Sequence, residues 1–181
     1  HYLDPLQYLL CKDETSPVLI DYKGPRQHPE AVGRFDRITL TYDDGTTVAL
    51  DGDETLKDEP LLRGANGLCV YPKAKEGKTL RLKDANGWWP EEKVLATLAG
   101  LPKPAPQQTD FIDSCRNRKT FALNESNGFR SCTMFNLAIV AERLGRGFRF
   151  DPVALRAVDD QAADRLLYQG MRAPWKKEMW G

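Results

Sequence analysis

Aromatic and basic side chains that could contact a sugar stand at three separate points of the sequence. Trp89 and Trp175 are the preferred stacking candidates, because a flat indole ring matches the apolar face of a pyranose. Burial is the other role open to these rings, and a buried indole N–H then needs a hydrogen-bond acceptor. Arg130 precedes a long helical pattern and is a third candidate for substrate contact, with a surface ion pair as its alternative. Each residue thus has a binding role and a structural role to compare.

Residues for metal binding or hydrolysis form no recognisable pattern. The four cysteines lack the close pairing of zinc ligands, so the spacing predicts no metal site and is typical of buried thiols: Cys11, Cys69, Cys115 and Cys132. No G-x-S-x-G turn occurs, and no pair of acidic residues has a spacing that argues for a hydrolase. A hydrolase that uses carboxylates of this chain therefore has no motif in its support.

Composition and charge restrict the classes of partner. The 26 Lys and Arg residues balance 26 Asp and Glu residues among 181, and the basic ones are scattered, so we expect no nucleic-acid partner. No stretch approaches the roughly 18 uninterrupted apolar residues of a membrane helix, so we expect no membrane partner. A hydrophobic content of 41% can support one sizeable core, and a single domain over residues 1–181 is expected.

The first half of the chain is predicted to form a helix and then strands. Residues 1–10 place leucines at helical spacing, and residues 17–22 form a short β run. Residues 37–50 alternate in polarity and break at Asp44-Gly45, which predicts a β-hairpin. A second strand pair is expected from residues 67–71 and 79–82.

The second half is predicted to be helical. Helices are expected at residues 91–98, 110–116, 131–146 and 159–168. The third follows the helical repeat most closely, and Gly147 is the expected left-handed cap at its end. Strands followed by helices predict an α+β domain with an open, mostly antiparallel sheet and helices packed on one face. The other face then predicts self-association, with a two-fold homodimer expected.

Three stretches of the sequence carry a resemblance to a known family. They are HYLDPLQYLL at residues 1–10, DFIDSCRNRKTF at 110–121, and the run RSCTMFNLAIVAERLGRGFRFDP through ADRLLYQGMRAPW at 130–175. The chain resembles the C-terminal domain of the Gfo/Idh/MocA oxidoreductases, in the branch common in Bacteroidetes and Planctomycetes. Residues 23–100 match only in general pattern. The resemblance implies an α+β fold of the type found in the C-terminal domain of glyceraldehyde-3-phosphate dehydrogenase.

The same resemblance implies where the cofactor binds. Full-length relatives place a Rossmann domain first and bind NAD or NADP on it, so an N-terminal Rossmann domain absent from this chain is the expected partner. No cofactor-binding residue is expected here, because Gly145-Arg146-Gly147 lacks the third glycine of the dinucleotide motif and follows a helix. The family's E-K-P motif is also absent, since Lys103-Pro104 is preceded by Pro102.

His1 corresponds in the resemblance to the family's catalytic histidine. In an intact enzyme it would exchange the proton of the substrate hydroxyl while hydride leaves the same carbon. The family's partner aspartate would stand four residues before it. The alternative is that His1 is a frayed terminal residue without a catalytic role.

Two functions follow as hypotheses. The first is the C-terminal domain of an NAD(P)-dependent sugar or polyol oxidoreductase, which supplies the substrate pocket and the oligomer interface and is inactive alone. The alternative is a stand-alone carbohydrate-binding or scaffolding module without redox activity. The sequence does not assign a compartment, because relatives in this branch often carry a twin-arginine leader, which leaves cytoplasm and periplasm both open.

Overall fold

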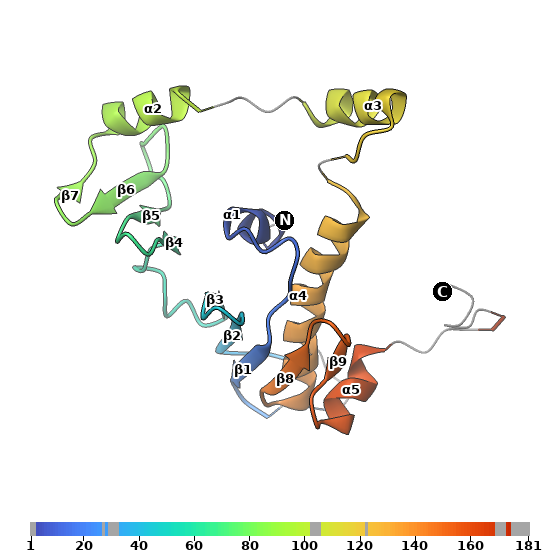
Figure 1. The fold of residues 1–181 in the computed structure, drawn as a ribbon. Coiled ribbons are helices and arrows are strands. Elements are labelled where there is room, and N and C mark those ends of the chain that lie inside the picture. Colours follow the sequence, from blue (N-terminus) through green and yellow to red (C-terminus); the bar gives the residue numbers. More distant parts are fainter. Residues whose placement is uncertain are drawn as a thin grey trace. The chain divides into compact units, whose positions relative to one another are not determined.

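Antiparallel pairing builds both sheets of the described chain. The computed structural model describes residues 3–26, 28, 33–101, 106–121, 123–168 and 173–174 (Figure 1). Contacts divide the chain into unit 1, residues 1–54 and 122–181, and unit 2, residues 55–121. The expectation of a single domain over residues 1–181 stays a prediction, and each unit is described by itself.

Unit 1 contains a five-stranded sheet in the order β3-β2-β1-β8-β9. Its strands are β1 (Leu19–Lys23), β2 (Arg37–Thr41), β3 (Thr47–Asp51), β8 (Phe148–Asp151) and β9 (Arg156–Ala157). The predicted hairpin is confirmed, because β2 and β3 pair along their whole length and Gly45 takes a φ of 83° in the turn. A residue with a side chain would be strained at this φ, which explains the glycine.

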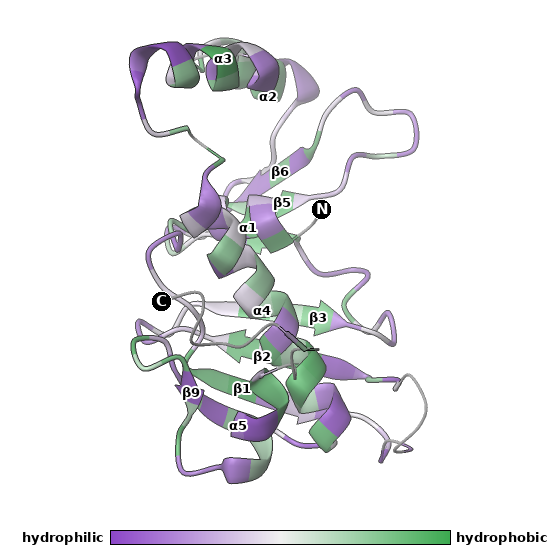
Figure 2. Cartoon of the chain, turned by 90° about the vertical axis from the view of Figure 1, so that its right-hand side faces the viewer, coloured by the Kyte–Doolittle hydropathy of each residue, from purple (hydrophilic) through white to green (hydrophobic). Residues whose placement is uncertain are grey.

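One long helix covers a face of this sheet. Helix α4 (Glu125–Leu144) turns Met134, Leu137 and Ala141 toward the strands, where they meet Ile20, Ile38 and Leu40 in the core. Burial of a Leu, Ile or Met side chain contributes about 1.5–3 kcal/mol, so this layer is a main source of the apolar stabilisation of unit 1. Figure 2 shows the hydrophobic positions of β1, β2 and α4 in green. The prediction that this helix packs on the sheet is confirmed.

The bounds of α4 differ from the expected 131–146. The helix begins six residues earlier because Asn124 caps it, accepting hydrogen bonds from the backbone N–H groups of Ser126 and Asn127 at 2.9 and 3.3 Å. It ends at Leu144, where Gly145 takes the left-handed conformation with φ 64°. The prediction of Gly147 as the cap is wrong. A Cβ at Gly147 would lie 2.4 Å from the Ile20 carbonyl oxygen, so this glycine permits close approach of β8 to β1.

Two short helices complete unit 1. Helix α1 (Leu3–Leu9) and helix α5 (Gln161–Leu167) both pack against α4. The Asp160 side chain caps α5 by accepting from the Ala163 N–H at 3.1 Å, and it also pairs with Arg146. This ion pair holds the pKa of Asp160 down to about 2. The cap and the ion pair together fix the short helix α5 to the end of α4.

Unit 2 contains a smaller sheet in the order β4-β5-β6-β7. Its elements are β4 (Leu62–Arg63), β5 (Cys69–Tyr71), β6 (Arg81–Asp84), β7 (Gly87–Trp88), α2 (Glu91–Ala99) and α3 (Gln107–Asn117). The predicted strand pair is confirmed in β5 and β6. Strands β4 and β7 are not predicted by the sequence pattern, since two residues are too few for an alternation in polarity to show.

The expected α+β class with antiparallel strands is confirmed. The strands form two sheets rather than one, because those of unit 2 pair only with their neighbours in sequence through short hairpins.

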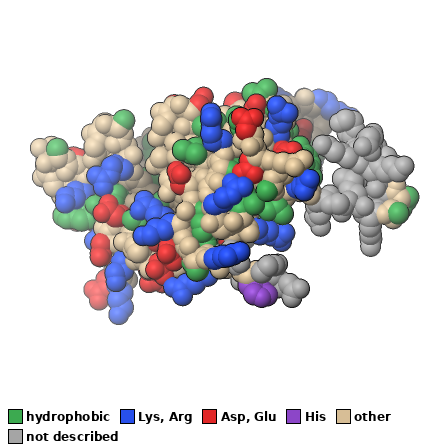
Figure 3. Space-filling model, turned by 90° about the horizontal axis from the view of Figure 1, so that it is seen from below, with side chains coloured by type: hydrophobic (Ala, Val, Ile, Leu, Met, Phe, Trp, Pro, Cys, Tyr) green, Lys and Arg blue, Asp and Glu red, His purple; other side chains and the backbone are tan. Residues whose placement is uncertain are grey.

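Acidic and basic side chains lie intermixed on the face shown in Figure 3. Within the described ranges, no helix has both the length and the apolar character needed to cross a membrane.

Candidate functional site

A hollow of about 450 Å³ lies in unit 1, where the loop after α1 meets the first turns of α4. Its lining residues are Asp13, Glu14, Glu125, Ser126, Phe129 and Arg130. We call it the α4 cavity. Arg130, one of the predicted substrate contacts, is among the lining residues, and the remaining five were not singled out by the sequence. The cavity therefore brings a predicted site residue together with three carboxylates.

The start of α4 explains why its four lining residues converge. Glu125, Ser126, Phe129 and Arg130 are separated by one, three and one positions, and residues three and four apart share a helix face. This face exists only because the Asn124 cap starts the helix before them. The expected start at Ser131 left them outside the helix. The cap at Asn124, with Asn127 three residues later, is the sequence signal that could have found them.

Two contacts orient Arg130. Its Nη1 donates to the Oγ of buried Ser16 at 3.4 Å, and its guanidinium carbon lies 5.4 Å from the centre of the Phe129 ring. The half-buried guanidinium pairs with no carboxylate of a described residue. The surface ion pair, the alternative role for Arg130, is therefore not seen in that part of the chain. Its other N–H groups are available for a ligand hydroxyl or carboxylate.

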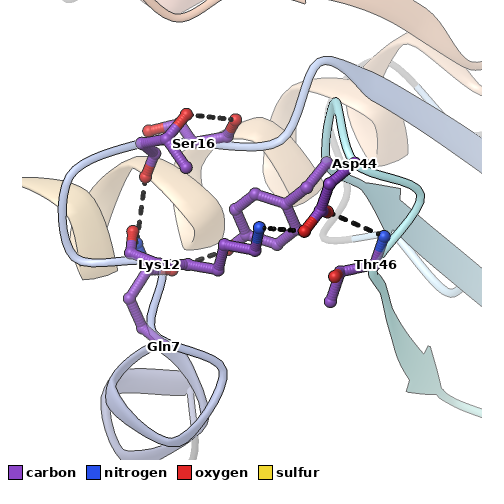
Figure 4. A network of polar contacts seen from close by, with 7 residues as sticks. Gln7, Lys12, Ser16, Asp44 and Thr46 are labelled. Atoms are coloured by element: carbon purple, nitrogen blue, oxygen red, sulfur yellow. Dashed lines mark hydrogen bonds and ion pairs between the residues drawn. The ribbon is translucent and has the colours of Figure 1, made fainter. Parts of the chain in front are cut away.

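A buried hydrogen-bond network places the loop that forms the other wall. The Gln7 side chain is fully buried, and its Nε2 donates to the carbonyl oxygens of Lys12 and Thr15 at 2.5 and 3.1 Å. Its Oε1 accepts from the Tyr42 hydroxyl at 2.7 Å. Figure 4 shows this network between α1, the loop and the hairpin turn. One core glutamine thus ties Asp13 and Glu14, which lie between its two carbonyl partners, to the sheet.

An ion pair adds to this network. Lys12 Nζ lies 2.6 Å from Asp44 Oδ2 and 5.2 Å from the centre of the Tyr42 ring (Figure 4). The bond from Lys12, together with the backbone N–H of Thr46, lowers the pKa of Asp44 to about 2. Burial, with the negative charges of Asp13 and Asp44, raises the pKa of Tyr42 to about 12. Tyr42 therefore stays neutral and remains a hydrogen-bond donor to Gln7 at ordinary pH.

Helix α1 is attached to α4 beside the cavity. The Ser131 hydroxyl donates to Asp4 Oδ1 at 2.7 Å, so Asp4, in the first turn of α1, bonds across to the residue that follows Arg130. His1 stands three residues before Asp4 and lies outside the described residues, as does Trp175. Their assignments, as catalytic residue and as sugar contact, stay predictions.

Trp89 belongs to unit 2, where it has structural contacts. Its Nε1 donates to Asp84 Oδ2 at 2.7 Å, and Lys93 Nζ lies 3.6 Å from the ring centre. The bond from Trp89 is the largest cause of the lowered pKa of Asp84. The indole N–H therefore has its acceptor, as expected for a packed tryptophan, and one ring face lies against an ammonium group. Sugar stacking by Trp89 stays a prediction.

A second hollow, of about 320 Å³, lies along α3 and the turn after it in unit 2. It is lined by Phe111, Ser114, Cys115, Arg118, Lys119 and Phe121. Cys115 is exposed, as are Cys11 and Cys132, so the expectation of four buried thiols is wrong for three of them. Cys115 and Cys132 occupy outward positions of α3 and α4, while Cys11 follows α1 at a positive φ of 55°. Only Cys69 is buried.

Among the described residues, the glycines nearest to a dinucleotide motif, Gly145 and Gly147, do not form a pyrophosphate-binding turn. Pyrophosphate binding needs a glycine-rich turn between a strand and the start of a helix. Gly145 and Gly147 stand instead between the end of α4 and the start of β8, and a Cβ at Gly147 would already meet the Ile20 carbonyl. The described residues also contain no group of three or more His, Cys, Asp or Glu side chains placed to hold a metal ion.

The α4 cavity is suited to binding hydroxyl groups. Carboxylates accept hydrogen bonds from hydroxyls, a guanidinium donates to them, and the Phe129 ring adds an apolar face to the lining. In a comparison with protein families, residues 1–177 match the family described as "Oxidoreductase family, C-terminal alpha/beta domain". No curated protein and no solved structure matches the chain.

Proposed function

The chain belongs to the Gfo/Idh/MocA oxidoreductase family as its C-terminal α/β domain, and from this premise we propose that it forms the substrate pocket of an NAD(P)-dependent sugar or polyol oxidoreductase. Domains of this family normally pair with an N-terminal Rossmann domain. NAD or NADP, bound on that domain, supplies the hydride acceptor. The residues of this chain bind and orient the hydroxyl compound.

The observation that carries this proposal is the α4 cavity. Its lining mixes hydrogen-bond donors and acceptors around one aromatic ring, which is the chemistry that a polyol needs. Arg130 is the central residue, because Ser16 and Phe129 hold its guanidinium while further N–H groups remain for a ligand. In this proposal the carboxylates of Asp13 and Glu14, in the loop after α1, accept hydrogen bonds from the ligand hydroxyls.

His1 is proposed as the residue that exchanges the substrate proton in the intact enzyme. The motivation is its place ahead of α1, whose first turn is bonded to α4 beside Arg130 through Asp4 and Ser131. Proton exchange requires a bound substrate and the hydride acceptor as well, so the chain is proposed to be inactive alone.

The sheet of unit 1 is proposed to self-associate through the face turned away from α4. Lys23, Arg37 and Asp51 form one row across that face and place both signs of charge there.

Substitution of Arg130 in the intact enzyme tests the pocket. Arg130→Gln removes a charge-assisted hydrogen bond of about 1.5–3 kcal/mol, so KM for a sugar or polyol should rise about tenfold or more. D-glucose and myo-inositol serve as probes. The matched control is Arg143→Gln, an exposed arginine on the same helix, which should leave KM unchanged. Equal effects of the two substitutions would contradict the role of Arg130.

A titration of the 181-residue chain with NADH tests the division of labour. We expect no change in NADH fluorescence, because the chain lacks a phosphate-binding turn among its described residues. Binding with micromolar affinity would contradict the proposal that the nucleotide binds elsewhere.

Light scattering on the same sample tests the proposed dimer. A monomer at high micromolar concentration would contradict self-association.

A further inference from the structure

One face of the small sheet in unit 2 gathers two aromatic and two cationic side chains. Strand register places Tyr71 opposite Arg81, and Lys83 opposite Trp88. Arg81 and Lys83 are two residues apart on β6, so both point to the same face. We call these four residues the Trp88 patch. The pairing of three strands, and not proximity in the sequence, brings them together.

The contacts within the patch are close. The Trp88 ring centre lies 4.8 Å from that of Tyr71, 4.9 Å from Arg81 Cζ and 5.5 Å from Lys83 Nζ. Trp88 is nevertheless 50% exposed, which is unusual for the largest apolar side chain in a sheet. Trp89, the next residue, is instead bonded to Asp84 and only half-buried. Packing therefore explains Trp89 but does not explain the exposure of Trp88.

The two cationic residues of the patch, Arg81 and Lys83, belong to a basic segment of the sequence. Residues 73–83 contain five cationic side chains and one acidic side chain, in a chain of zero net charge. Arg81 Nε donates to the Pro72 carbonyl oxygen at 3.0 Å, which leaves the other guanidinium N–H groups for a ligand. Neither Arg81 nor Lys83 pairs with a carboxylate of the residues that the structure describes. Two exposed cations beside an exposed ring thus have no negative partner there.

We propose that the Trp88 patch binds an anionic saccharide, with a uronic acid unit against the indole ring and its carboxylate on Arg81 and Lys83. The sugar part of this assignment rests on the proposed function. A guanidinium binds a carboxylate through two parallel hydrogen bonds, and the adjacent ammonium adds a point charge. The patch carries one exposed tryptophan and lacks the series of stacking rings that single-stranded nucleic acid uses. A negatively charged sugar is therefore the ligand that matches both the charge and the ring.

Isothermal titration calorimetry of the 181-residue chain tests this site. The probes are a trimer of galacturonic acid and the neutral galactose trimer with the same linkage. We expect the acidic trimer to bind at least about tenfold more tightly, because each charged hydrogen bond contributes about 1.5–3 kcal/mol. Arg81→Gln and Lys83→Gln should each weaken its binding by about tenfold. The matched control, Lys57→Gln, changes an exposed lysine that precedes β4 and should have no effect.

The ring is tested separately from the charges. Trp88→Leu should abolish binding, and circular dichroism checks that this variant folds. Trp88→Tyr, which keeps an aromatic face, should retain part of the binding and serves as the test if Trp88→Leu does not fold. Equal affinity for the two trimers, no binding of either, or tighter binding of a short DNA duplex would overturn the proposal. Arg130→Gln should leave the affinity for the acidic trimer unchanged. Loss of that affinity in Arg130→Gln would place the ligand in the α4 cavity and overturn the proposal for the Trp88 patch. If Arg130→Gln instead leaves KM of the intact enzyme unchanged, that result counts only against the proposed function.

Discussion

Unit 1 and unit 2 both contain antiparallel sheets, but different interactions hold them. Unit 1 covers its sheet with a 20-residue helix and buries a continuous apolar core. Unit 2 has strands of two to four residues, and Val94 and Cys69 are its buried apolar residues among those described. Its sheet face carries cation–π and aromatic contacts instead. Hydrophobic burial is the larger of these free energies, so unit 1 is expected to be the more stable.

The comparison matters for function, because the two candidate sites lie on supports of different strength. The α4 cavity is built on the core helix and on a loop tied to the sheet by Gln7. The Trp88 patch lies on a sheet with few buried contacts and can adjust more readily to a ligand. A pocket that must orient a reacting carbon benefits from the first kind of support.

The largest predicted difference concerns matched leucine substitutions. Leu137→Ala, in the α4 core, should lower the free energy of unfolding by about 2–5 kcal/mol, because it leaves a cavity among fully buried side chains. Leu82→Ala, at a half-buried position of β6, should cost about 1 kcal/mol. Urea unfolding followed by circular dichroism measures both. Similar losses would mean that the two units do not differ in the way their contacts suggest.

Loss of the Tyr42 hydroxyl should have the next largest effect. Tyr42→Phe leaves the buried Gln7 oxygen without its donor, at a cost of about 1–3 kcal/mol. The loop that carries Asp13 and Glu14 should loosen with it, seen as faster amide exchange at residues 12–15. Tyr8→Phe is the control, since Tyr8 is 71% exposed. Unchanged exchange in Tyr42→Phe would show that Gln7 alone holds the loop.

The smallest effect is a change in acid stability. The pKa of Asp44 is lowered to about 2 in the folded chain, below its unfolded value of about 3.9. The resulting stabilisation is therefore present above pH ~4 and is lost as the pH falls through ~2. Asp44→Asn should reduce the slope of the unfolding free energy against pH in this window. The slope between pH 7 and 9 should stay unchanged. An unaltered slope would show that the pairing with Lys12 does not survive in solution.

Sequence patterns predicted local structure wherever the pattern was long enough. The hairpin of β2 and β3 and the pair β5 and β6 were found because alternation and turn residues are local properties. The start of α4 was missed because residues 125–130 are mostly polar and carry no apolar repeat, and only the Asn124 cap marks it. That error concealed most of the α4 cavity. Arg130 was identified, while its companions in the lining were not.

The sequence by itself determined the α+β class, the family and the core face of α4, since each depends on residue types at regular spacing along one segment. Only the tertiary structure decided which distant residues meet. Gln7 with Tyr42, Arg130 with Ser16 and Trp88 with Arg81 come together through strand register and helix packing. Those contacts depend on the summed free energy of the whole core, which no local pattern in the chain records.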